Sequence, residues 1–184
     1  MGQAAEQIES LQRYIDDVPN AARAMHAALG RDGLPDDARR VLIGALNYMI
    51  DLLDIFPDHY RGLGLADDAA VLRVAARLAV EAGAGDPELG RLARESAEVA
   101  SIFGELAGPF DKLVASLPDR EVRGRTTAQI LGSKDVRATF DADIQRAIGK
   151  LQPGPIEVGV GGPEGAVREL LRMTQAALKK ANLV

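Results

Sequence analysis

The sequence predicts an all-α fold, a compact multi-helix bundle, on three observations. Only 4% of the 184 residues are aromatic and there is no Trp, so Ala, Leu, Val and Ile must fill the core, which suits packed helices better than sheets. Apolar residues recur at spacings of three and four, the period of one helix face. Proline and glycine divide these periodic stretches into pieces of helix length.

The first third of the chain predicts three helices. Apolar spacing indicates a helix over residues 3–18, which Pro19 then breaks, and a second, short helix over residues 21–29. A longer helix begins at Pro35, where two aspartates in the first turn favour the positive end of the helix dipole. Its apolar stripe continues to residue 56, and the next proline ends it.

The middle of the chain continues the same pattern. Asp67 or its neighbour is expected to cap a helix that stops at Gly83. A further helix is predicted over residues 87–106, and the Gly-Pro pair at residues 108–109 separates it from a short helix over residues 110–117.

The last third begins with a basic stretch. Arg120, Arg123 and Arg125 are spaced singly and indicate a solvated surface linker. Two helices follow, over residues 126–131 and 133–151, and the second carries a serine at its expected N-cap.

Proline and glycine then divide the chain into three parts. Residues 1–151 form the predicted helical domain, residues 152–165 are a Gly/Pro-rich tether, and residues 166–184 are an amphipathic C-terminal helix. This helix docks either on its own core or on a partner, and we favour its own core.

Residues 48–72 carry the most distinctive motif. The end of one helix reads Asp54-x-x-Pro57-Asp58, and the head of the next reads Gly64-x-x-Asp67-Asp68. Four carboxylates therefore gather around one turn, which we call the acidic turn: Asp54, Asp58, Asp67 and Asp68.

This motif resembles the YkvA-like domain of unknown function (DUF1232) over about residues 41–80. The match includes Tyr48, Asp54, Pro57, Asp58, Gly64, Asp67 and Asp68. The chain departs from the family pattern where Leu52 replaces a usual proline, and where Asp51, His59 and Arg61 make the hairpin more polar. The resemblance implies a helical hairpin with an acidic turn, and the family has no established common activity to carry over.

Two interpretations of the acidic turn stay open. Its four aspartates suit Mg²⁺, Mn²⁺ or Ca²⁺, which take carboxylate oxygens, and His59 offers a nitrogen ligand. In the other interpretation, which we favour, Asp67 or Asp68 caps a helix and Asp54 accepts hydrogen bonds from loop amides. No other cofactor is indicated, because the glycine-rich residues 159–165 lack the lysine of a phosphate-binding loop.

Composition narrows the class of function and the compartment. A formal net charge of −5 disfavours nucleic acid as a partner, because phosphate binding needs clustered Lys and Arg. The chain has no cysteine, no apolar N-terminal signal region and no apolar run long enough to span a membrane. We therefore expect a cytoplasmic protein.

The sequence favours a non-enzymatic helical interaction or scaffold module. It has only two histidines, His26 and His59, and no G-x-S-x-G nucleophile motif. We expect a protein partner or a second copy of the chain. The alternatives are a divalent-metal-dependent enzyme or metal-binding protein that uses the acidic turn, and a peripheral membrane protein, which the polar Asp51 and Arg61 disfavour.

Overall fold

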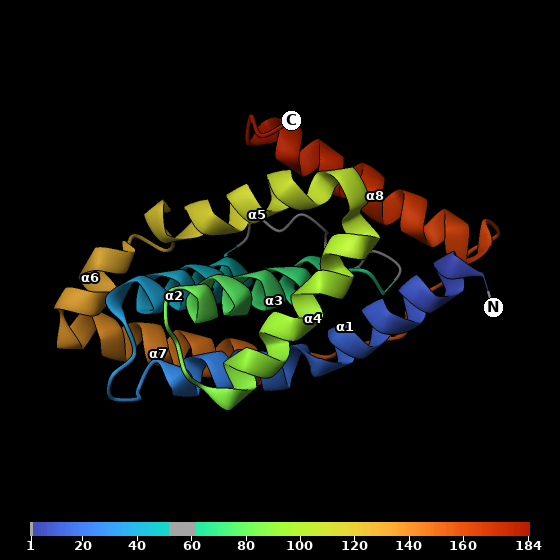
Figure 1. Ribbon diagram of the computed structural model, residues 1–184. Coiled ribbons are helices and arrows are strands. Elements are labelled where there is room, and N and C mark those ends of the chain that lie inside the picture. Colours follow the sequence, from blue (N-terminus) through green and yellow to red (C-terminus); the bar gives the residue numbers. More distant parts are fainter. Residues whose placement is uncertain (1, 52–61) are drawn as a thin grey trace.

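The computed structural model describes residues 2–51 and 62–184, and these residues form an all-α bundle (Figure 1). Within them the only β pairing is an isolated bridge between Val122 and Arg125. The predicted fold class is confirmed. The helices are α1 Gln3–Ala28, α2 Asp36–Ile50, α3 Ala66–Glu81, α4 Pro87–Phe103, α5 Ala107–Ser116, α6 Thr127–Gly132, α7 Lys134–Ile148 and α8 Gly162–Lys180, with 3₁₀ turns η1 Gly104–Leu106 and η2 Leu117–Asp119.

Helices α2 and α3 form the centre of the bundle. Residues 42–50 of α2 and 66–76 of α3 are buried on every side, and α1, α4, α5 and α7 pack around the pair. Alanine is frequent in the buried part of α3, which lets neighbouring helices approach closely. Among the helices of the described residues, none combines the length and the apolar character needed to cross a bilayer.

Helix α1 runs without interruption through Pro19, so the predicted break there is wrong. A proline inside a helix removes one backbone hydrogen bond and normally kinks or ends it. Here Val18 and Ala21 lie on either side of the proline and are both completely buried. Packing on both sides of Pro19 stabilises the continuous helix, a tertiary contribution that local propensity does not include.

Helix α2 ends at Ile50, earlier than the predicted end near residue 56. Asp51 is already extended, and residues 52–61 lie outside the described part of the chain. The Nε of Arg123, on a distant loop, donates to the carbonyl oxygen of Ile50 at 3.1 Å. A side chain from another part of the fold therefore satisfies a terminal carbonyl of α2.

The starts of α4 and α7 follow local sequence chemistry. Asp86 caps α4 by accepting hydrogen bonds from two backbone amides, and Ser133 caps α7 as predicted. The Gly-Pro pair at residues 108–109 lies in the first turn of α5, where proline is tolerated, so it does not separate two helices. The separation occurs at Gly104, whose φ of 55° belongs to the left-handed region.

The basic stretch after η2 is partly buried, which corrects the prediction of a solvated linker. The side chain of Arg125 is almost enclosed, and its Nη2 donates to Asp143 on α7 at 2.7 Å. Burial raises the pKa of Asp143, but the hydrogen bond and the positive charge of Arg125 lower it by more. The pKa of Asp143 therefore lies below its ordinary range. Arg125 therefore fastens this loop to α7, as Arg123 fastens it to α2.

The C-terminal region packs on the same bundle. Gln12 of α1 binds both the carbonyl oxygen of Gly154 and the amide of Ile156, which fixes the proline- and glycine-rich segment along α1. Helix α8 begins at Gly162, before the predicted start at residue 166, and lies against α1, α5 and η1 (Figure 1). Its apolar face is covered by its own chain, as the sequence analysis favoured.

Two glycines provide a matched test of packing around α2. A Cβ at Gly44 would lie 2.7 Å from the nitrogen of Pro118, whereas one at Gly90 of α4 would meet only the far end of Arg94 at 3.7 Å. We expect Gly44→Ala to destabilise the fold by about 1–3 kcal/mol through overpacking. Gly90→Ala should stabilise it by about 0.5–1 kcal/mol through helix propensity. Denaturant melts of both variants measure the difference, and equal effects would contradict the close approach of α2 and η2.

Candidate functional site

Two residues of the acidic turn lie buried at the start of α3. Asp67 is 1% exposed and Asp68 is 6% exposed. The N-cap position belongs to Leu65, whose side chain makes no capping bond, so the expectation that Asp67 or its neighbour caps the helix is wrong. Both carboxylates lie within the first turn, where the positive end of the helix dipole stabilises negative charge.

Tyr48 connects this turn to α2. Its Oη donates to Oδ2 of Asp67 at 2.6 Å, in a fully buried hydrogen bond between the two central helices. A bond to a charged acceptor is stronger than one between neutral groups. The motif residue Tyr48 therefore holds one carboxylate of the acidic turn in place.

The other members of the predicted metal site, Asp54, Asp58 and His59, lie outside the described residues. Within residues 2–51 and 62–184, no group of three or more His, Asp or Glu side chains is arranged to hold a metal ion. The other histidine of the chain, His26, contacts a different carboxylate, because its Nε2 lies 2.8 Å from Asp141 of α7. The described residues thus supply two of the four predicted ligands, Asp67 and Asp68.

A charged cluster that the sequence analysis missed lies where α1, α3 and α4 meet. Its centre is Arg73 of α3, which is 1% exposed although it carries a full charge. Its Nε donates to Glu95 at 2.8 Å and its Nη2 to Asp17 at 3.3 Å. The guanidinium carbon lies 4.0 Å from the ring centre of Tyr14, a cation–π geometry. Burial lowers the pKa of Arg73, and the nearby carboxylates partly offset that effect.

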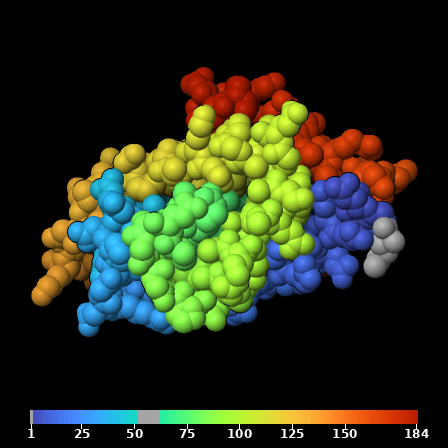
Figure 2. Space-filling model, viewed as in Figure 1, coloured from blue at the N-terminus to red at the C-terminus, as the bar shows by residue number. Residues whose placement is uncertain are grey.

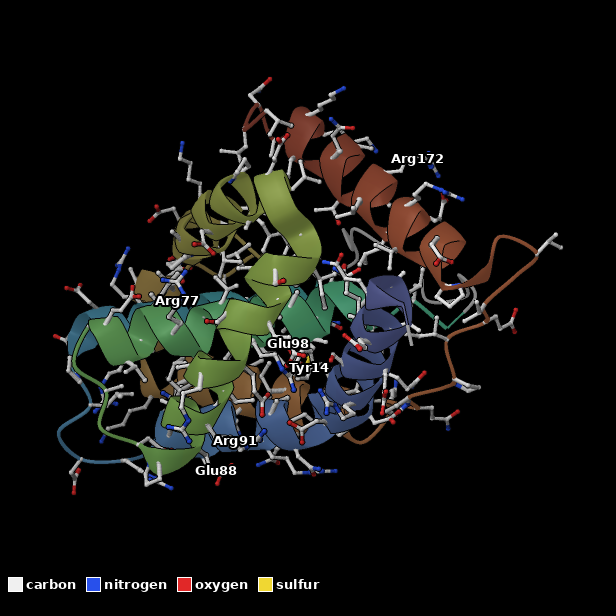
Figure 3. The ribbon with its side chains drawn as sticks, turned by 45° about the vertical axis from the view of Figure 1, so that its right-hand side comes forward. Tyr14, Arg77, Glu88, Arg91, Glu98 and Arg172 are labelled. Carbon is white, nitrogen blue, oxygen red and sulfur yellow. The ribbon has the colours of Figure 1, made fainter. Side chains whose placement is uncertain are left out.

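Arg91 of α4 extends this arrangement, which we call the arginine network. It binds Asp17 at 3.1 Å and Glu95 at 2.7 Å, the two carboxylates that also bind Arg73. These groups line an open cavity of about 410 Å³ together with Arg13, Tyr14 and Glu98. Three arginines meet three carboxylates there, so opposite charges balance. We infer that the network joins α1 to α3 and α4, as Figure 3 shows at Tyr14, Glu98 and Arg91.

In contrast to the arginine network, a groove between the start of α2, α6 and the start of α7 has more cationic than acidic residues in its lining. This basic groove has a volume of about 880 Å³. We call the apolar part of its lining, Ala128, Ile130 and Leu131, its floor, and the charged part its rim. The rim has four cationic residues and one acidic residue, on a chain whose net charge is −5. The lining residues are Asp36, Arg39, Arg40, Ala128, Ile130, Leu131, Gly132, Ser133, Lys134 and Arg137.

The cations of the basic groove are only partly neutralised. Arg40 and Arg137 pair with Asp119 and Asp141, respectively. The guanidinium of Arg39 donates hydrogen bonds to three backbone carbonyl oxygens, and its charge has no carboxylate partner among the described residues. Exposed Lys134 likewise makes no ion pair with any residue that the structure describes. The groove therefore presents positive charge around an apolar floor.

Comparison with known proteins does not identify the chain. No protein-family model, no curated protein and no solved structure matches it. The resemblance to the YkvA-like domain stays a prediction that rests on the motif of residues 48–68 alone.

The arginine network predicts a pH-dependent stability through Glu98. Hydrogen bonds from Ser10 and Tyr14 lower the pKa of Glu98. The stabilisation of the fold by ionised Glu98 is therefore complete above the ordinary carboxyl pKa of about 4.3. It is lost as the pH falls through the lower pKa that Glu98 has in the folded state. Tyr14→Phe removes one of these donors but keeps the ring beside Arg73.

We expect Tyr14→Phe to cost about 1 kcal/mol at pH 7. This is less than the ~1.5–3 kcal/mol that is usual for a hydrogen bond to a charged group, because the Glu98 side chain is 46% exposed. The loss should shrink as the pH falls through the lowered pKa of Glu98, because the protonated carboxyl group no longer offers a charged acceptor in either protein. Urea melts across pH measure it. In a Glu98→Ala background the tyrosine change should have little further effect, and an equal loss at every pH would contradict the assignment.

Proposed function

We propose that this chain is a non-enzymatic helical interaction module that binds a protein segment in the basic groove. The observation that carries the proposal is the combination of an apolar floor with unneutralised cations at its rim. Such a surface fits an apolar side chain flanked by carboxylates, because the floor takes the side chain and the rim takes the charges.

The exposed apolar surface of the floor comes from Ala128 and Leu131. Leu131 is 38% exposed, one of a few large apolar side chains that reach solvent in the described residues, whereas its neighbour in sequence, Ile130, is buried. Covering Leu131 removes apolar surface from water, which favours association. Lys134 stands beside it at the first position of α7 and can reach a carboxylate without breaking an existing ion pair.

The other charged cluster is less suited to binding. In the arginine network Asp17 and Glu95 each contact two arginines, and Arg73 is enclosed. An incoming anion would have to displace these internal carboxylates. We therefore assign the arginine network a structural role, in which it joins α1, α3 and α4, and assign binding to the basic groove.

A labelled peptide tests the groove directly. The probe is a short peptide with glutamates on both sides of a central leucine, and fluorescence anisotropy measures its binding to the full chain. We expect Lys134→Glu to weaken binding by about tenfold, since it reverses an unpaired charge at the rim. Binding should also weaken with added salt, which screens exposed charges.

Lys112→Glu is the matched control for this measurement. Lys112 is an exposed lysine on α5 that does not line the groove, so the change in net charge is the same. The control should bind the peptide like the unmodified chain. Equal weakening by both variants would show a non-specific charge effect and would contradict binding in the groove, as would the absence of any binding.

Divalent-metal binding at the acidic turn is the second candidate function. The observation in its favour is the burial of two adjacent carboxylates, Asp67 and Asp68, since buried charges are normally paired or bound to metal. This function predicts near-stoichiometric metal in the purified protein. It also predicts a melting temperature that rises in Mg²⁺, Mn²⁺ or Ca²⁺ relative to chelator, and that Asp68→Asn removes this rise.

Asp37→Asn is the control, because Asp37 also lies in the first turn of a buried helix but is exposed. It should keep the metal-dependent rise. A chain without metal, whose melting temperature is the same in metal and chelator, would leave the acidic turn with a purely architectural role.

A further inference from the structure

We propose that the segment bound in the basic groove is the loop of residues 157–161 of a second copy, together with Glu164 in the first turn of α8, so that the chain associates head to tail. This inference rests on the proposed function, because it uses the same groove. It adds the identity of the partner, the chemistry of the docking segment and the geometry of the assembly.

The loop of residues 157–161 exposes apolar side chains between two carboxylates, one in the loop and one in the first turn of α8. Val160 is fully exposed and Val158 is 42% exposed. Glu157 and Glu164 lie on either side and are exposed, and neither pairs with a cation among the described residues. Exposed valine flanked by acidic residues is the chemistry that the apolar floor and cationic rim of the groove fit.

The loop is held in position at both ends. The amide of Ile156 donates to Gln12 at 2.7 Å, and the Ile156 side chain is buried. On the other side, the amide of Gly162 donates to the carbonyl of Gly159 at 2.9 Å, which closes a turn with Val160 at its tip. Because this turn is formed before any contact, docking requires little ordering of the loop.

Large exposed apolar residues concentrate at these two places. Within the described residues they are Leu131 in the groove, Val158 and Val160 in the loop, and Val184 at the C-terminus. The groove carries the positive charge and the loop carries the negative charge. Two complementary surfaces on one chain are the requirement for contact between unlike faces of two copies.

The positions of the two surfaces set the geometry of association. In Figures 1 and 2, α6 and the start of α7 lie at one end of the molecule, and the segment that leads into α8 lies at the opposite end. The loop cannot reach the groove of its own chain across the bundle. A contact between unlike ends leaves one free groove and one free loop in each dimer, so further copies can add.

A contact made by one short loop is small, and small interfaces are weak and transient. We therefore expect self-association at protein concentrations of about 0.1–1 mM. Sedimentation velocity of the full chain across this range should show an average mass that rises with concentration. The rise should diminish in high salt, because exposed charges contribute to the contact.

Two single variants separate the two halves of the contact. Lys134→Glu alters the groove and keeps the loop, whereas Val160→Lys alters the loop and keeps the groove. Both residues are exposed, so each chain should keep the unmodified melting temperature. Each variant alone should stay monomeric, and an equimolar mixture should form a one-to-one dimer, since the intact loop of one fits the intact groove of the other.

Lys112→Glu and Val184→Lys are the matched controls, and both should associate like the unmodified chain. A chain that stays monomeric at 1 mM, or variants that associate like the unmodified chain, would overturn the head-to-tail contact. If the glutamate–leucine peptide still binds the groove in that case, the interaction module stands and its partner is another protein. If the peptide does not bind either, both proposals fail.

Discussion

The fold depends on how the charge of Arg73 is accommodated at the junction of α1, α3 and α4. A buried charge without partners is very costly, and breaking a buried pair typically destabilises a protein by about 3–5 kcal/mol. Asp17 comes from α1 and Glu95 from α4, so the guanidinium on α3 is satisfied only when all three helices are in place. Apolar packing holds many arrangements of alanine-rich helices together, whereas these directional contacts select one.

The aromatic ring of Tyr14 contributes to the same selection. It covers the guanidinium face of Arg73, while its hydroxyl group reaches Glu98 on α4. One side chain on α1 thereby contacts both neighbouring helices through different parts of its surface. In a chain with so few aromatic residues, this position adds shape and hydrogen-bond specificity that Ala, Leu and Val cannot supply.

The sequence predicted the fold class and most helices because burial on one or all faces leaves a periodic pattern. It failed where distant residues decide the outcome. Pro19 stays inside α1 because core residues pack on both sides of it. Helix α2 ends at Ile50, whose carbonyl oxygen accepts a hydrogen bond from Arg123 in a loop far along the chain. Neither effect has a signature within a few residues of the position that it changes.

The same limit applies to the candidate sites. The acidic turn was visible because its carboxylates are close in sequence, and the structure describes two of them, Asp67 and Asp68. Arg73 left one local signal, a single cation inside an otherwise apolar part of α3, but its partners lie 56 and 22 positions away. The basic groove left no local signal, because its lining combines residues near the start of α2 with residues of α6 and α7.

The arginine network and the groove that we propose for binding thus lie in different parts of the bundle. The arginine network joins α1, α3 and α4, whereas the basic groove is built on α2, α6 and α7. Lys134 of the groove is exposed and makes no ion pair among the described residues, so changing it removes no such contact, unlike a change at Arg40 or Arg137. The charge of the groove can therefore be changed at Lys134 without loss of the arginine network that joins α1, α3 and α4.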